Sequence, residues 1–331
     1  MKSTKDLGMM PEEKYLITGF SGFVGRHFCE YLERNNVSAY IKGIDVRQHD
    51  IKLDDYSNIR IDFEKIDLLS ENEVEKLISN FKPKFILHLA SFSSVAFSWK
   101  EPILSFRNNT NIFLNILEAV RKYSSKTRVL SIGSSDEYGN IRGENIRLEE
   151  SHPLNPISPY AVARVSQELL SKIYVNSYGL DIVLTRSFNH IGPSQTDVFV
   201  ISAFARQLIK MKKMNCLNGK LVTGDVSIIR DFIDVRDVVS AYYLLLHSGE
   251  KGETYNVCSG QGMSLREIIS IMADVLNMKV TITIDEKLIR PNDIKKIVGH
   301  NEKIQQTLGW KPKFTLRQSL CDVLDYWDSI L

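Results

Sequence analysis

The glycine-rich segment TGFSGFVG at residues 18–25 constrains the fold of this chain more than any other feature. It follows an apolar run from Tyr15 to Thr18 and leads into a pattern in which Val24, Phe28 and Leu32 recur with helical spacing. Glycines between a strand and a helix let the backbone turn tightly and approach a phosphate, while the helix N-terminus offers amides to it. The segment therefore predicts a strand, a phosphate-binding turn and a helix.

An acidic residue at the expected distance makes this prediction more specific. Asp45 ends the next β-rich run, about 20 residues after Gly25, where a carboxylate can bind the ribose hydroxyls of an adenine dinucleotide. Asp45 favours NAD because it repels a ribose phosphate, whereas Arg47 is close enough to bind one and leaves NADP open. Asp67 can accept from the adenine amino group, or it is simply an exposed loop aspartate.

Short β-rich runs alternate with helical patterns through the first half of the chain, which predicts parallel strands joined by right-handed helical crossovers. These runs cover residues 15–18, 39–45, 85–90, 128–133 and 181–186. We therefore predict an α/β fold, a Rossmann-type doubly wound parallel sheet with a smaller C-terminal mixed α/β substrate domain. The predicted division is a flexible lead-in at 1–13, a cofactor domain at 14–188 plus about 234–262, and a nucleotide-sugar domain at 189–233 plus 263–331.

Composition excludes several classes of partner. Lys and Arg number 42 against 40 Asp and Glu, without a polybasic run, so we expect neither nucleic acid nor an anionic membrane as partner. No apolar stretch reaches the length of a membrane span or a signal-peptide core. Because the four cysteines lie far apart, we predict no disulfide framework, no metal site and a cytoplasmic protein.

Hydroxyls and carboxylates gather where the fourth of these runs ends, in the segment GSSDEYG at residues 133–139. Ligands of parallel sheets bind at the carboxyl ends of the strands. Ser158 can cap the next helix, on which Tyr160 and Arg164 share one face at i and i+4. A cation beside a tyrosine favours the phenolate, which can exchange a proton with a sugar hydroxyl or carbonyl, and Ser134 can bind the same oxygen.

Taken together, the chain from Tyr15 onward resembles the extended short-chain dehydrogenase/reductase family, which acts on nucleotide sugars. Within it, the chain is most similar to GDP-4-keto-6-deoxy-D-mannose reductases, with GDP-mannose 4,6-dehydratases as close relatives. The resemblance rests on segments 88–90, 93–99, 133–139, 158–160, 187–195, 230–237, 255–260 and 288–291.

The resemblance implies catalytic roles for Ser134, Asp136, Tyr160 and Arg164. Arg164 occupies the place of the family's lysine, which holds the nicotinamide ribose; arginine keeps the charge but is planar and bulkier. Asp136 falls where dehydratases carry a proton-abstracting glutamate and is one methylene shorter. This difference favours reduction of a 4-keto group over elimination.

The resemblance also implies which residues bind the ligands. Besides Tyr160 and Arg164, the expected NAD(P) contacts are Gly19, Ser21, Gly22, Phe23, Val24, Gly25, Asp45, Arg47, Asp67, Leu68, Leu89, Ala90 and Asn109. The expected contacts to a GDP-linked sugar are Ser93, Ser94, Ser134, Ser135, Asn189, Val200, Arg206, Arg230, Arg290 and Asp293. A helix cap is an equally good interpretation of Ser93 and Ser94. A homodimer formed through two helices, one of them carrying Tyr160, is expected on the same ground.

Two alternatives stay open. The same fold can recycle a tightly bound NAD as a 4,6-dehydratase, a 4-epimerase or a 4-dehydrogenase, and Asp45 favours this interpretation. Alternatively, the protein binds nucleotide sugars but its catalysis is impaired. This interpretation rests on Arg164, which occupies the place of the family's lysine.

Overall fold

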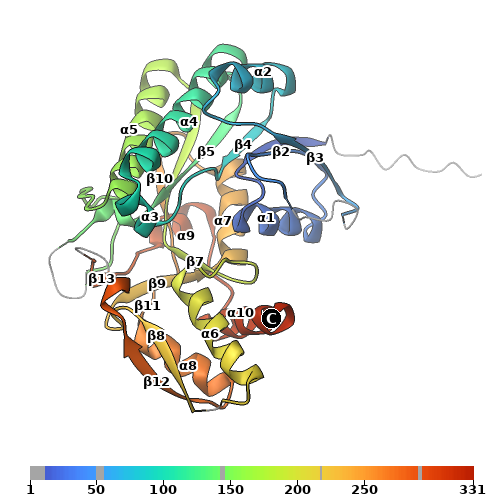
Figure 1. Ribbon diagram of the computed structural model, residues 1–331. Coiled ribbons are helices and arrows are strands. Elements are labelled where there is room, and N and C mark those ends of the chain that lie inside the picture. Colours follow the sequence, from blue (N-terminus) through green and yellow to red (C-terminus); the bar gives the residue numbers. More distant parts are fainter. Residues whose placement is uncertain (1–11, 50–55, 142–145, 217, 290–292) are drawn as a thin grey trace, which may run out of the picture.

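A computed structural model describes residues 12–49, 56–141, 146–216, 218–289 and 293–331. Figure 1 shows a large sheet with helices on both faces and a smaller α/β region beside its lower edge. The predicted fold class is confirmed.

In the described part of the chain, the large sheet has seven strands in the order β10-β6-β5-β4-β1-β2-β3, and all its pairings are parallel. Its strands are β1 (Glu13–Thr18), β2 (Ala39–Asp45), β3 (Ile59–Lys65), β4 (Phe85–His88), β5 (Arg128–Ser134), β6 (Asp181–Ser187) and β10 (Thr254–Val257). The direction of winding reverses between β1 and β4, and a reversal of this kind opens a crevice at the carboxyl ends of parallel strands.

Helices cover both faces of this sheet because each presents one apolar stripe to it. On one face lie α1 (Phe23–Arg34) and α7 (Val235–Ser248), whose side chains share a core with the sheet. The other face carries α2 (Glu71–Phe81), α4 (Pro102–Tyr123) and α5 (Pro159–Tyr178), with the short α3 (Val95–Lys100) before α4.

The predicted start of α5 is confirmed. Ser158 is the N-cap, its hydroxyl accepts the Ala161 N–H at 3.1 Å, and Pro159 occupies the first turn. This cap fixes where Tyr160 stands relative to the sheet, since Tyr160 lies within the first turn of the helix.

The smaller region has its own apolar core, built on short strands and three helices. Its strands are β7 (Asn189–Ile191), β8 (Asn218–Thr223), β9 (Ile229–Asp234), β11 (Gly262–Ser264), β12 (Lys279–Ile284) and β13 (Lys296–Ile297). Its helices are α6 (Val200–Lys213), α8 (Leu265–Val275) and α10 (Leu316–Ile330), with a short 3-10 turn at Glu286–Leu288.

The chain crosses between the two regions more than once. After β9 it returns to the large sheet through α7 and β10, within the range of about 234–262 predicted for the cofactor domain, and β10 pairs with β6. Ile304 of α9 (Glu302–Leu308) and Trp310 then pack into the core of the large sheet, outside the range predicted for the cofactor domain. The domain boundaries themselves stay a prediction.

The predicted lead-in is wrong at its last residue. Glu13 begins β1 instead, and its carboxylate accepts from the Tyr15 hydroxyl at 2.7 Å and pairs with Lys84 at 2.6 Å. Residues 1–11 lie outside the described part. Within the described residues, no helix is long and apolar enough to cross a membrane, no cluster of His, Cys, Asp and Glu could hold a metal ion, and all four cysteines are free.

Candidate active site

The glycine-rich turn between β1 and α1 has no room for a side chain at Gly19 or Gly25. Gly19 has a φ of +68°, and a Cβ there would stand 2.7 Å from the Ala90 backbone nitrogen. A Cβ on Gly25 would stand 2.6 Å from the carbonyl oxygen of Phe20. The turn therefore packs directly on the backbone after β4, and its amides at the start of α1 can approach a pyrophosphate.

Asp45 stands beside this turn and is held by two backbone donors. Its carboxylate accepts the Ser21 N–H at 3.1 Å and the Arg47 N–H at 3.0 Å, while its side chain stays largely buried. A carboxylate has about four acceptor sites, so it can still accept from a ribose diol. The Arg47 guanidinium lies 3.9 Å away and is mostly exposed.

The remaining predicted cofactor residues differ in their exposure. Phe23 and Val24 are half-buried on α1, Leu68 is buried, and Asp67 is exposed with its carboxylate accepting the Leu69 N–H. Asn109 is buried, and its amide binds the Phe92 backbone at both its oxygen and its nitrogen. It thus holds the loop that contains Leu89 and Ala90, whose N–H donates to Thr18. Together with Asp45, this glycine cradle fits a dinucleotide.

Tyr160 and Arg164 form the centre of what we call the tyrosine corner, which also includes Ser134, Ser91 and Gln167. Arg164 Nε donates to the Tyr160 hydroxyl at 3.3 Å, and both residues are buried. Arg164 Nη1 donates to the Ile132 carbonyl at 2.9 Å, which ties α5 to β5 two residues before Ser134. The structure therefore brings the predicted tyrosine, arginine and strand end together.

The acceptors around Arg164 carry no charge. They are the Tyr160 hydroxyl, the Ile132 carbonyl, the Gln167 amide oxygen at 2.8 Å and the Ser91 hydroxyl at 2.6 Å. Among the described residues, no carboxylate pairs with this guanidinium, so its charge acts on the surroundings. Burial and then this charge lower the pKa of His88 to about 3.

Ser134 is fixed by the turn that follows it. Its hydroxyl accepts the Asp136 N–H at 3.2 Å, and its own N–H donates to Glu137 Oε1 at 2.6 Å, which completes a capping box on the short helix Ser135–Tyr138. Burial, followed by the charge of Glu168, raises the pKa of Glu137 well above its usual value. Glu137 thus faces the protein interior and supports Ser134, while Asp136 is the half-buried carboxylate of this turn.

The hydrogen bonds around Ser134 and Tyr160 leave both hydroxyls able to act as donors. The oxygens of Ser134 and Tyr160 each accept an N–H from the protein, from Asp136 and Arg164 respectively. Each hydroxyl keeps its hydrogen to donate to a third group. Two such donors can stabilise an oxygen that gains negative charge, and the phenol can also transfer its proton.

Three residues in this corner or directly behind it were not predicted as site residues from the sequence. Gln167 lies three residues after Arg164, a spacing that puts both on one helix face, and Glu137 completes a Ser-x-x-Glu pattern with Ser134. The spacing of Gln167 and the pattern that includes Glu137 can both be recognised in the sequence. Ser91, by contrast, reaches Arg164 only through the fold, and no local pattern points to it.

The predicted sugar-nucleotide residues lie mainly in the smaller region. Arg230 Nη2 donates to Asp293 at 2.8 Å, and its Nη1 donates to the Ile229 carbonyl. We call Arg230 and Asp293 the phosphate edge, after the phosphate contact predicted for Arg230. Arg206 pairs with Asp197 at 2.8 Å on the surface. Arg290 lies outside the described residues.

The other predicted substrate residues vary in environment. Ser94 caps α3 by accepting the Phe97 N–H at 3.2 Å, which is the helix-cap interpretation, while Ser93 is exposed. Ser135 is buried, Asn189 is exposed on β7, and Val200 begins α6. Their contacts to substrate stay a prediction.

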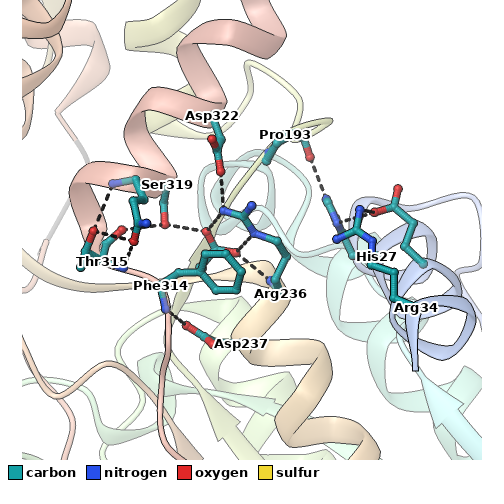
Figure 2. Close-up of polar contacts among 12 residues, drawn as sticks. His27, Arg34, Pro193, Arg236, Asp237, Phe314, Thr315, Ser319 and Asp322 are labelled. Carbon is teal, nitrogen blue, oxygen red and sulfur yellow. Dashed lines mark hydrogen bonds and ion pairs between the residues drawn. The ribbon is translucent and has the colours of Figure 1, made fainter. Parts of the chain in front are cut away.

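The segment that continues from Arg230 serves to join the two regions. Figure 2 shows Arg236 between Asp322 and Phe314, and the guanidinium lies 3.8 Å from the Phe314 ring centroid. Arg236 also binds both carboxylate oxygens of Asp234. On the other side, His27 of α1 meets the Pro193 carbonyl at 3.0 Å. These contacts hold the loop after β7 and the start of α7 against α1 and α10.

The chain is similar to known proteins over most of its length. The family model described as GDP-mannose 4,6 dehydratase matches residues 16–323. The chain is 33% identical over 317 residues to the GDP-6-deoxy-D-mannose reductase of Pseudomonas aeruginosa, a match that covers 96% of this chain and 98% of that protein.

Two solved structures are similar over nearly their whole length. The structure of RMD from Pseudomonas aeruginosa complexed with NADPH has a TM-score of 0.82 and 32% identity, covering 96% of this chain and all of that one. The UDP-glucose 4-epimerase of Thermus thermophilus in complex with NAD has a TM-score of 0.81 and 28% identity, covering 96% of this chain and 99% of that one.

Proposed function

The chain belongs to the GDP-mannose 4,6-dehydratase family of extended short-chain dehydrogenase/reductases, and from this premise we propose that it reduces the 4-keto group of a GDP-linked 4-keto-6-deoxy sugar. GDP-4-keto-6-deoxymannose or a close analogue is the proposed substrate. As a member of this family, the protein is an NAD(P)-dependent oxidoreductase acting on nucleotide sugars.

The observation that carries the proposal is the pair of hydroxyls in the tyrosine corner. Ser134 and Tyr160 each accept an N–H and keep a hydrogen to donate, which suits a ketone oxygen becoming an alcohol. When bound, the reduced nicotinamide supplies the hydride to carbon four. Tyr160 gives its proton to the oxygen on that carbon, Ser134 hydrogen-bonds the same oxygen, and Arg164 stabilises the phenolate left behind.

The dinucleotide is proposed to be NADH or NADPH. Asp45, with two acceptor sites already on backbone amides, favours NADH because its charge repels a ribose phosphate. The exposed guanidinium of Arg47 can bind that phosphate and supports NADPH. The similar P. aeruginosa structure is complexed with NADPH.

The GDP part rests on the name of the similar reductase and on the phosphate edge. Arg230 can exchange its carboxylate partner for a pyrophosphate, because a guanidinium binds both with the same fork of N–H groups. Arg290 is proposed to assist it, and Asp293 to bind the nucleotide ribose.

A homodimer is proposed on the exposed apolar faces of α4 and α5. Ile103 is 83% exposed, and Leu169, Ile173 and Val162 are exposed on the outer face of α5. A second copy would cover them, and sedimentation of the purified protein tests this. The four free cysteines suit the proposed cytoplasmic location.

A second candidate keeps the same site but recycles its cofactor as a 4,6-dehydratase, 4-epimerase or 4-dehydrogenase. Asp45 and the similarity to an epimerase in complex with NAD favour it. The third candidate is a protein that binds sugar nucleotides with impaired catalysis. It is considered because Arg164 occupies the place of the family's lysine.

The direct test is to mix purified protein with GDP-4-keto-6-deoxymannose and either NADH or NADPH, and to follow nicotinamide absorbance and the sugar product. We expect consumption of at least one cofactor; no consumption with either contradicts the proposal. Cofactor released on denaturation, with turnover of an alcohol sugar without added nicotinamide, would favour the second candidate. Activity that appears only in Arg164→Lys would favour the third.

A further inference from the structure

The guanidinium of Arg164 is held from behind by a chain of side chains on α5 and β5. Arg164 Nη1 donates to Gln167 Oε1 at 2.8 Å, and Gln167 Nε2 donates in turn to the Ser131 hydroxyl at 3.0 Å and the Ile132 carbonyl at 3.1 Å. Ser171 donates to the same Ser131 oxygen at 3.1 Å. All of these groups except the guanidinium are neutral, and Gln167, Ser131 and Ser171 are buried.

Hydrogen-bond chemistry fixes which way the Gln167 amide points. A guanidinium only donates, so the amide must turn its oxygen toward Arg164. Its NH₂ group then meets two acceptors, Ser131 and Ile132. The Ile132 carbonyl accepts from both Arg164 and Gln167, so the two side chains are bound to the same residue of β5.

Anchoring Nη1 sets the direction of the other two nitrogens of the Arg164 guanidinium. With Nη1 fixed, Nε faces the Tyr160 hydroxyl and Nη2 faces Ser91 in the loop after β4. We propose that Gln167 is a positioning residue for catalysis, which aligns Arg164 with Tyr160 and the cofactor cleft without cancelling its charge. This inference deepens the proposed ketone reduction and rests on it.

The covalent lengths of the two basic side chains give the inference its test. The ammonium of a lysine occupies the place of the arginine Cζ, one bond short of the Nη atoms that reach Gln167 and Ser91. The anchor should therefore matter when residue 164 is arginine and matter little when it is lysine. A merely structural role of Gln167 would cost the same in both backgrounds.

The experiment is a double-mutant cycle with Gln167→Met, which keeps the length of the side chain and removes its hydrogen bonds, and Arg164→Lys. In the Arg164 background we expect kcat to fall about 10- to 100-fold, the range for a hydrogen bond to a charged group. Cofactor affinity, measured by fluorescence titration, should weaken about 2- to 10-fold. In the Arg164→Lys background the same substitution should change both by less than about threefold.

Ser166→Ala, on the same helix, is the matched control and should leave kcat and cofactor affinity unchanged. Equal losses in both backgrounds, or no loss beside Arg164, would overturn the inference. If the wild type reduces no keto sugar, the proposed function fails, and the cycle is decided by cofactor affinity, where the same two patterns apply. If Gln167→Met does not fold, Ser131→Ala takes its place and should show the same dependence on residue 164.

Discussion

The tyrosine corner and the phosphate edge each contain a well-buried arginine, and the two arginines differ in what accepts their hydrogen bonds. Arg164 donates to hydroxyl, carbonyl and amide oxygens, whereas Arg230 donates to the Asp293 carboxylate. Neutral acceptors satisfy a guanidinium and leave its charge in place, but a carboxylate cancels much of that charge. In the proposed function, the corner is thus arranged before substrate binds, whereas Arg230 would exchange Asp293 for the pyrophosphate.

The largest expected effect is at the centre of the corner. Tyr160→Phe removes the proposed proton donor, so kcat should fall about 10²- to 10⁴-fold, the usual contribution of a general acid. Cofactor affinity should change little, since the ring remains. Tyr178→Phe, at the exposed end of the same helix, is the control and should keep full activity. A Tyr160→Phe enzyme with kcat within about threefold of the wild type would exclude the proposed role.

The ion pairs beside the two regions should differ in their contribution to stability. Behind the corner, the buried Glu168 accepts two hydrogen bonds from the buried Arg186, at 2.9 and 2.8 Å. Near the edge, Asp225 pairs with Lys295, which is 73% exposed. Glu168→Gln should lower the free energy of unfolding by about 3–5 kcal/mol, and Asp225→Asn by at most about 1 kcal/mol. Urea titrations of both variants measure this, and equal losses would contradict the distinction.

The buried pair also predicts a dependence on pH. Burial alone would raise the pKa of Glu168, but the hydrogen bonds and charges of Arg186 and Lys172 lower it to about 2. Because the folded pKa lies below the ordinary value of 4.5, its stabilisation is complete above that value and is lost as the pH falls toward 2. The stability difference between wild type and Glu168→Gln should shrink over this window in urea titrations. A difference that is constant with pH would show that Glu168 keeps its ordinary pKa.

Removing each arginine's charge should affect different kinetic constants. Arg164→Gln should lower kcat about 10- to 100-fold, because its charge stabilises the phenolate formed during proton transfer. Arg230→Gln should instead raise KM for the nucleotide sugar by about the same factor, since the proposed phosphate contact would be made equally in the ground and transition states. Steady-state kinetics of the two variants measure this. Loss of kcat in Arg230→Gln with KM unchanged would contradict the comparison.

The smallest expected effect concerns the cofactor. Asp45→Asn removes the charge that repels a ribose phosphate and should shift the preference from NADH toward NADPH by about tenfold, near 1.4 kcal/mol. The Ser21 and Arg47 amides donate to different oxygens of Asp45, so asparagine can keep only one of these two hydrogen bonds. The loss of the other should weaken both cofactors alike, and the ratio of the two affinities reports the charge. Fluorescence titration with both cofactors measures the shift, and an unchanged ratio would mean that Arg47 decides the preference.

Local patterns were enough to predict much of this molecule. Alternating runs predicted the parallel sheet, and the capping signal of Ser158 predicted the start of α5, because strand periodicity and helix caps are encoded by neighbouring residues. Glu13 was misassigned because its place in β1 depends on pairing with Ala39, which lies on another strand.

The contacts of the site also fall into those that a local pattern predicts and those that depend on the fold. Tyr160 and Arg164 share a helix face, so their contact follows from spacing alone. The partnership of Arg230 with Asp293 joins residues 63 positions apart, and that of Arg164 with Ser91 joins residues 73 apart. No local pattern encodes such pairs, since they depend on how the strands and loops are brought together.

The most direct test of the contrast between the corner and the edge is a crystal structure with oxidised cofactor and GDP-mannose, whose carbon four already carries a hydroxyl. We predict that this hydroxyl lies within hydrogen-bonding distance of both Ser134 and Tyr160, and that Arg164 keeps its bonds to Gln167 and Ser91. Arg230 should have left Asp293 for the pyrophosphate. A sugar bound away from Tyr160, or a pyrophosphate bound while Arg230 still holds Asp293, would contradict the account.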